Sequence, residues 1–159
     1  MAQVVGQRGA PRLVEGVVDG GQQRPDQAVG LPRVVAVAVE PNPDIHVYAP
    51  GAEQMGYRVI GLTMAPVPHV RFEPVEFPAS EIYHFEPLDE YVPVYLRPFT
   101  LLQEVVVEAS VAAASALEDI DTLTLTGSFD YQTCDDEFCF NPVSVPLTFT
   151  LDLEVHDNQ

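Results

Sequence analysis

The carboxyl-terminal part of the chain alternates between apolar and polar residues with a period of two. The residues that share one face of each of two runs are mainly apolar: Leu123, Leu125, Phe129, Tyr131 and Thr133 in the first, and Val143, Val145, Leu147, Phe149, Leu151 and Leu153 in the second. Because successive side chains of a strand point to opposite faces, both runs are predicted to be half-buried strands. Residues 134–142 join them, which predicts an antiparallel hairpin.

Short apolar segments without a helical period also precede this hairpin. They cover residues 34–40, 45–50, 57–66 and 99–111, and Pro, Gly, Asn or Asp residues interrupt them. Each is predicted to be a strand. Residues 109–120 are expected to form a connecting loop with a short helix. Seven or eight strands without crossover helices predict an all-β fold, an antiparallel β-sandwich of immunoglobulin-like type.

Two segments differ from this pattern. Residues 1–30 are rich in Gly, Gln, Pro and Arg and have no sustained period, so we expect a tail, a linker or a misassigned start, with one β-sandwich domain at 31–159. From Pro66 to Pro98, nine of the 33 residues are Pro or His, which predicts a largely irregular or edge-like segment. Because a long irregular loop is often functional, this one is a candidate cap.

The charge of the chain narrows the classes of partner. Seven Arg and no Lys face 24 acidic residues, so the formal net charge is −17. Such a field disfavours nucleic acid and anionic membrane surfaces. The chain has no run of about 18 apolar residues, so direct membrane insertion is not expected. No signal peptide is visible at the start, so we expect a cytosolic chain or a start that is not the natural one.

The chain has two cysteines, Cys134 and Cys139, separated by the four residues DDEF. The ends of a tight loop between paired strands lie close enough for a disulfide. A disulfide across so short a loop would stabilise the fold little, because loop-closure entropy grows with loop length. The spacing therefore favours a redox-active pair, while an ordinary hairpin disulfide and two unreactive thiols stay open as alternatives.

Three acidic residues, Asp135, Asp136 and Glu137, lie between the cysteines. Their negative charge disfavours the thiolate forms, so the reduced pair is expected to give electrons away to a partner. The four histidines are dispersed and lack paired ligand spacing, so neither a metal nor another cofactor is predicted. The sequence also lacks a nucleophile-elbow motif, so a hydrolytic function is not expected.

The stretch "YQTCDDEFCFNPVSVPL" resembles the cysteine motif of the amino-terminal periplasmic domain of the DsbD thiol:disulfide interchange family. "DIHVYAPG" and "VPVYLRPFTLLQEVVV" resemble two strands of that domain, and the resemblance covers about residues 34–155. It implies an immunoglobulin-like sandwich in the periplasm. Its redox pair, Cys134 and Cys139, would accept electrons from a membrane-embedded protein and pass them to thioredoxin-like proteins.

The resemblance also suggests residues around the cysteines. His46 and Tyr48 would lie near the site, and Tyr131 is a further near-site candidate, although all three could instead be core aromatics. A mobile cap with a shielding aromatic would fall between Glu76 and Tyr95. Its candidate residues are Phe85, Asp89, Glu90 and Tyr91.

Two functions follow as hypotheses. The first is thiol-disulfide exchange through a mixed disulfide, with Cys134 facing the partner and Cys139 resolving the intermediate. The second is a non-catalytic β-sandwich interaction module, appended to a redox protein, whose disulfide is structural.

Overall fold

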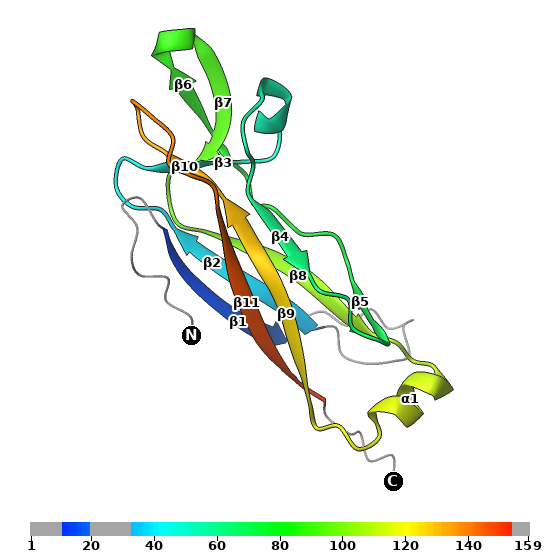
Figure 1. Ribbon diagram of the computed structural model, residues 1–159. Helices are drawn as coiled ribbons and strands as arrows, with labels where there is room; N and C mark the ends of the chain where they lie inside the picture. The colour runs from blue at the N-terminus through cyan, green and yellow to red at the C-terminus, as the bar shows by residue number, and fades with distance from the viewer. Residues whose placement is uncertain (1–10, 20–32, 154–159) are drawn as a thin grey trace.

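A computed structural model describes residues 11–19 and 33–153 of the chain. The described part is mostly strand, as the sequence predicts, and it is elongated (Figure 1). A two-sheet body occupies most of its length. A third sheet lies at one end and helix α1 (Val111–Leu117) at the other.

The body consists of two antiparallel sheets. The strands of the first sheet, in spatial order, are β1 (Arg12–Asp19), β2 (Arg33–Glu40), β8 (Phe99–Val107) and β5 (Val70–Phe72). Those of the second are β11 (Val143–Asp152), β9 (Thr122–Tyr131) and β4 (Gly61–Met64). Strands β9 and β11 pair from Thr122 with Asp152 to Tyr131 with Val143, so the predicted carboxyl-terminal hairpin is confirmed.

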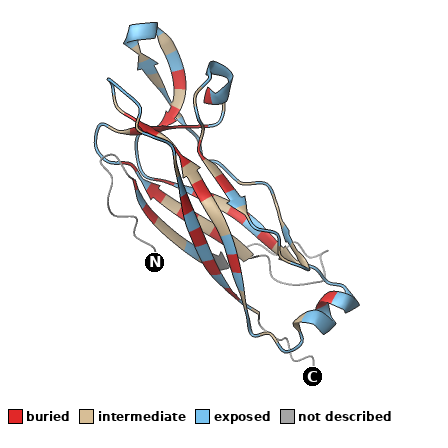
Figure 2. Cartoon of the chain, viewed as in Figure 1, coloured by how far each residue is buried: buried red, intermediate tan, exposed pale blue. Residues whose placement is uncertain are grey.

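The alternating pattern of the sequence fills the space between these sheets. Four of the predicted inward positions of β11 are buried, namely Val145, Leu147, Phe149 and Leu151, and Val143, at the start of the strand, is partly buried against the same core. Alternate valines of β2 and residues of β8 and β9 join them in one apolar core (Figure 2). Burying one such side chain stabilises the fold by about 1.5–3 kcal/mol, so the core determines which face of each strand points inward.

The third sheet, which we call the head sheet, has the order β10 (Thr133–Cys134), β3 (His46–Tyr48), β7 (Glu90–Tyr95) and β6 (Glu81–Phe85). Its two faces contact different groups. Val47 and Tyr95 belong to the core of the body, whereas Tyr48 and Val94 belong to a second, smaller cluster. The head sheet therefore closes one end of the sandwich and supports a separate site on its other face.

The predicted irregular cap is wrong over residues 81–95, where β6 and β7 form a hairpin. A 3-10 helix, η2 (Glu86–Leu88), and Asp89, with φ of 51°, make the turn. Pro93 lies inside β7, and its carbonyl accepts a hydrogen bond from the Ala49 N–H, just past the end of β3. The N–H and C=O of a strand residue point toward the same neighbouring strand. The missing N–H of Pro93 therefore falls where the pairing of β7 with β3 ends. The edge-like prediction is confirmed for β5 and β6, which are the outer strands of their sheets.

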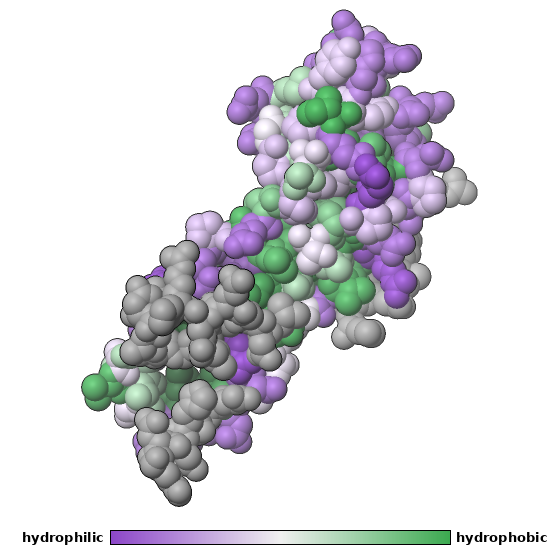
Figure 3. All heavy atoms as spheres, turned by 180° about the vertical axis from the view of Figure 1, so that it is seen from behind, coloured by the Kyte–Doolittle hydropathy of each residue, from purple (hydrophilic) through white to green (hydrophobic). Residues whose placement is uncertain are grey.

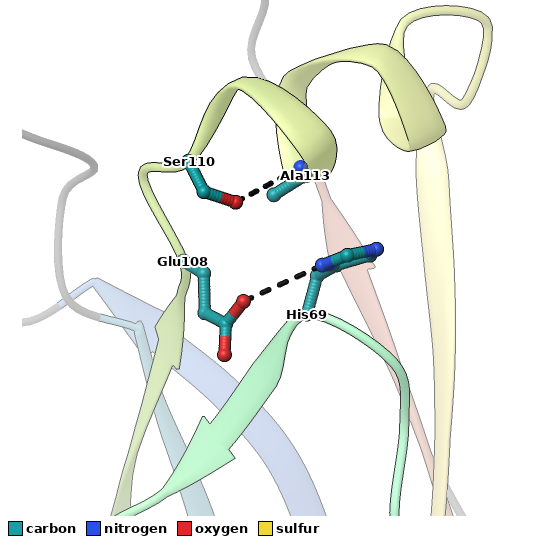
Figure 4. Close-up of polar contacts among 4 residues, drawn as sticks. All are labelled: His69, Glu108, Ser110 and Ala113. Carbon is teal, nitrogen blue, oxygen red and sulfur yellow. Dashed lines mark hydrogen bonds and ion pairs between the residues drawn. The ribbon is translucent and has the colours of Figure 1, made fainter.

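Strand β1 lies within the segment expected to be a tail or linker. It pairs with β2 along its whole length, and Leu13 is buried in the core of the body. The rest of residues 1–30 lies outside the described residues, except for Pro11. The expected short helix after β8 is α1, and the Ser110 Oγ caps it by accepting a hydrogen bond from the Ala113 N–H (Figure 4).

Candidate functional site

The cysteine pair forms a disulfide, with 4.0 Å between the Cα atoms of Cys134 and Cys139. The chain leaves β9 at Tyr131, and the next strand, β10, pairs with β3 instead of β11. Cys134 therefore lies directly opposite His46 in the head sheet. The two cysteines are close, as the hairpin predicted, but the strand that holds Cys134 belongs to another sheet.

Hydrogen bonds within the loop hold the disulfide segment in place. The carboxylate of Asp135 accepts hydrogen bonds from the backbone N–H groups of Glu137 and Phe138, both at 2.8 Å. These donors lower the pKa of the Asp135 carboxyl group. The Asp135 N–H donates to the Phe138 carbonyl at 3.0 Å, and the Phe140 N–H donates to the Thr133 carbonyl at 2.9 Å. Asp135 thus shapes the turn as well as placing charge beside the sulfurs.

The two cysteines differ sharply in exposure. Cys134 is 1% exposed and packs in a group we call the disulfide cluster: Tyr48, Ala52, Val92, Val94 and Cys134. Cys139 is exposed at the surface, and its Sγ lies 3.8 Å from the Tyr48 hydroxyl. Cys139 is therefore the more accessible of the two cysteines, whereas Cys134 was expected to face outward. Strand β10 places Cys134 under the aromatic residues of the head, whereas the loop returns Cys139 to the surface.

Aromatic rings pack over the disulfide cluster. The Tyr48 and Tyr57 rings stack with 4.3 Å between their centroids, and Tyr57 donates a 2.5 Å hydrogen bond to Glu90. The Tyr83 hydroxyl donates to the Asp136 carboxylate, which connects strand β6 to the cysteine loop. These two hydrogen bonds to carboxylates raise the pKa of Tyr57 and of Tyr83 to about 12.

His46 lies among these rings and is 3% exposed. Its ring centroid is 4.6 Å from that of Tyr83 and 5.3 Å from that of Tyr48. Burial lowers the pKa of His46, while the negative charges of Asp136 and Asp135 oppose that shift. His46 and Tyr48, which the resemblance suggested as near-site residues, lie beside Cys134 and Cys139, and Glu90, through Tyr57, and two of the three acids lie at the same place.

The remaining candidates lie elsewhere. Tyr131 packs on Phe129 in the core of the body, with 5.6 Å between ring centroids. Tyr91 is exposed and stacks on His84 at 4.5 Å, and Asp89 contacts His84 Nε2 at 2.8 Å.

Phe85 is half-buried at the end of β6, and Glu137 is exposed in the cysteine loop. Within the hairpin it is Tyr83, two residues before Phe85, that contacts both His46 and Asp136. Sequence reasoning missed Tyr83 and Tyr57. The alternation in "EIYHF" was the available signal, since it puts Tyr83 and Phe85 on one face of a strand.

The fold and the site together define an all-β protein with a disulfide-bonded cysteine pair at one end of its described part. Compared with known proteins, the chain matches no family model and no curated protein. No group of three or more His, Cys, Asp or Glu side chains suited to a metal ion occurs in residues 11–19 and 33–153. In the same residues, no helix has the length and apolar character needed to cross a membrane.

Proposed function

We propose that this chain is a thiol-disulfide exchange module, of the kind that the DsbD amino-terminal domain represents. It passes electrons between partners through Cys134 and Cys139. The partners are thioredoxin-like proteins and a membrane-embedded thiol-disulfide protein, and the module works in the periplasm or another extracytoplasmic space. The resemblance in the cysteine segment suggests these partners and this location.

The unequal exposure of the two cysteine residues is the observation that carries this proposal. Exchange begins when a thiolate attacks one sulfur of a disulfide while the other sulfur leaves. Cys139 is exposed, so a partner thiolate attacks its Sγ, and the Cys134–Cys139 bond breaks. The partner is then joined to Cys139, and Cys134, 1% exposed, leaves within the head. A second thiol of the partner then attacks the partner sulfur of the mixed disulfide, so that Cys139 leaves as a thiolate, the partner is oxidised to a disulfide and the module is reduced.

The surroundings of the pair suit a module that reacts only with chosen partners. Tyr48 contacts the Cys139 Sγ, and Tyr83 of the hairpin is tied to Asp136 of the cysteine loop. Phe138, which is 55% exposed, lies next to Cys139 in the sequence and gives a partner an apolar contact. Hydrophilic residues dominate the head surface seen from behind (Figure 3), so a small number of apolar residues can direct docking.

A redox titration of the full chain tests the proposal. The protein is equilibrated with reduced and oxidised dithiothreitol at a series of ratios, and the fraction of free thiol is measured by alkylation and mass spectrometry. Reduced thioredoxin is then added to the oxidised chain. We expect reduction by thioredoxin and a potential above about −300 mV, because structural disulfides of secreted proteins fall below that value. A lower potential together with resistance to thioredoxin would rule out exchange.

The second candidate is a structural disulfide in a β-sandwich interaction module. Burial of Cys134 among Val92 and Val94 favours it, since Cys134 packs like a core residue. Under this function, replacing both cysteines by alanine would cost about 5 kcal/mol, the upper end of the values typical for structural disulfides of small secreted domains. A loss of only about 2 kcal/mol in that double variant would leave exchange as the better explanation.

A further inference from the structure

We propose that His46 is the base that accepts the proton of the Cys134 thiol when this thiol resolves a mixed disulfide at Cys139. This inference rests on the exchange function proposed above and adds to it a specific proton acceptor. It concerns the direction in which the reduced module donates electrons.

The register of the head sheet brings the two side chains together. Cys134 and His46 are direct partners in the antiparallel pairing of β10 with β3. Directly opposite residues of such a pair have their Cβ atoms about 4.5–5.5 Å apart on the same face. Both residues are buried, at 1% and 3% exposure, and both lie beside Tyr48. The imidazole and the thiol therefore share one enclosed space.

The Cys134 thiol needs a base because of where it lies. Burial in apolar surroundings disfavours the thiolate, and the neighbouring acids disfavour it further. No Lys exists in the chain to stabilise a thiolate, and Cys134 packs with apolar and tyrosine side chains. A thiol in this position loses its proton readily only if a neighbouring group takes it.

His46 is the group in this space best suited to accept that proton. The titratable groups that face it are Tyr48 of β3, Tyr83 of β6, Cys134 of β10 and, in the loop, Asp135 and Asp136. The phenols hold their protons at neutral pH, since burial raises the pKa of Tyr48 and the bond to Asp136 raises that of Tyr83 to about 12.

The two carboxylates already have other partners. Asp135 accepts two backbone hydrogen bonds, and Asp136 accepts one from Tyr83. Burial keeps His46 neutral at pH 7, because it lowers the pKa from 6.5, so the ring can accept a proton. The imidazolium that forms is then stabilised by the charges of Asp135 and Asp136.

Proton transfer to His46 accompanies closure of the Cys134–Cys139 disulfide. The Cys139 thiolate has attacked the disulfide of a partner and now holds one partner sulfur. His46 takes the proton of the Cys134 thiol, and the Cys134 sulfur attacks the Cys139 Sγ. The Cys134–Cys139 bond forms, the bond from Cys139 to the partner breaks, and the partner leaves as a thiolate. The module is oxidised by two electrons, the partner is reduced by two, and the proton remains on His46 until solvent or the partner takes it.

A disulfide reagent that releases a coloured thiolate measures the two steps separately. The full chain is reduced, freed of reductant and mixed with 5,5′-dithiobis(2-nitrobenzoate) in a stopped-flow instrument from pH 5 to pH 9. The first release of thionitrobenzoate reports the attack by Cys139, and the second reports resolution by Cys134. The unmodified chain is compared with His46→Gln, His46→Phe and the control His84→Gln. His84 is an exposed histidine of the same head.

We expect both His46 variants to slow the second release about 100-fold at pH 7, which is the low end for general-base catalysis, and to leave the first unchanged. In the unmodified chain and in His84→Gln, the rate of the second release should level off above the pKa of His46. In both His46 variants it should rise about tenfold per pH unit, because hydroxide then removes the proton. His46→Phe keeps the ring contacts with Tyr48 and Tyr83, so it separates packing from proton transfer.

If the second release has the same rate and the same pH profile in the unmodified chain and in the His46 variants, the proposed role of His46 is overturned while the exchange function stays intact. Absence of a second release from the unmodified chain would refute the exchange function itself. If neither variant folds, NMR titration of the His46 ring in the unmodified chain decides the point. A His46 pKa that is the same in the reduced and the oxidised chain would overturn the proposal, since a coupled thiol must shift it.

Discussion

Reduction of the disulfide should destabilise the fold only modestly. The bond joins residues five apart in the sequence. For a loop of this length, the chain-entropy relation gives about 2 kcal/mol of stabilisation by the disulfide. The loop hydrogen bonds of Asp135 and Phe140 do not involve the sulfurs and should persist after reduction. A loss of 2 kcal/mol corresponds to a melting temperature about 4–8 °C lower for a chain of this size.

The assay compares urea and thermal unfolding of the full chain with and without tris(2-carboxyethyl)phosphine, followed by circular dichroism. The variant with alanine at both Cys134 and Cys139 serves as control, because the reductant should not change its stability. By linkage, 2 kcal/mol lowers the reduction potential by about 40 mV relative to an unstructured loop, whereas 5 kcal/mol would lower it by about 100 mV. Loss of 5 kcal/mol or more on reduction would refute the loop-entropy reasoning and favour a structural disulfide.

Three further changes test individual contacts. Gly127→Ala should lower the free energy of unfolding, measured in urea, by about 1–3 kcal/mol, because the added Cβ would lie 2.5 Å from a backbone oxygen of β4. Gly16→Ala is the control, because a Cβ there meets open space, and equal losses in the two variants would contradict this reasoning. The fold favours the neutral phenol of Tyr83, so its contribution to stability is lost as pH rises from 10 to about 12. Tyr83→Phe should therefore flatten that alkaline loss, and an unchanged profile would argue against the bond to Asp136. Stability should also fall as pH drops below 6.5, because His46 has a lowered pKa in the fold and the unfolded chain binds the proton more readily. His46→Gln should reduce this slope, and an equal slope in both proteins would show that His46 does not cause it.

The parts of the fold that followed from the sequence were those with a long, unbroken period of two. The pairing of β9 with β11 is the best example, because ten alternating residues in each strand leave one register that buries the apolar face. Where Pro and His interrupt the pattern, the prediction held only in part. Strands β5 and β6 lie at sheet edges as expected, but residues 81–95 form a hairpin that turns at Asp89 and not an irregular cap.

The candidate site, like the fold, could be predicted from the sequence only in part. The proximity of Cys134 and Cys139 could be predicted because both belong to one short loop, and nearness in the sequence ensures nearness in space. Their unequal exposure could not, because it depends on β10 leaving the hairpin to pair with β3. Likewise, nothing local indicates that Tyr83 reaches Asp136 from 53 residues away.

The sequence by itself determined the all-β class, the face that each long strand buries and the presence of one close cysteine pair. These properties depend on residue spacing, and spacing is written directly in the chain. Only the tertiary structure decided that Cys134 is buried opposite His46 while Cys139 faces outward, because that outcome depends on which distant strands share hydrogen bonds. The alternating pattern of the carboxyl-terminal strands thus predicts the β-sheet scaffold, and the non-local pairing of β10 with β3 in the head sheet gives the two cysteines different environments.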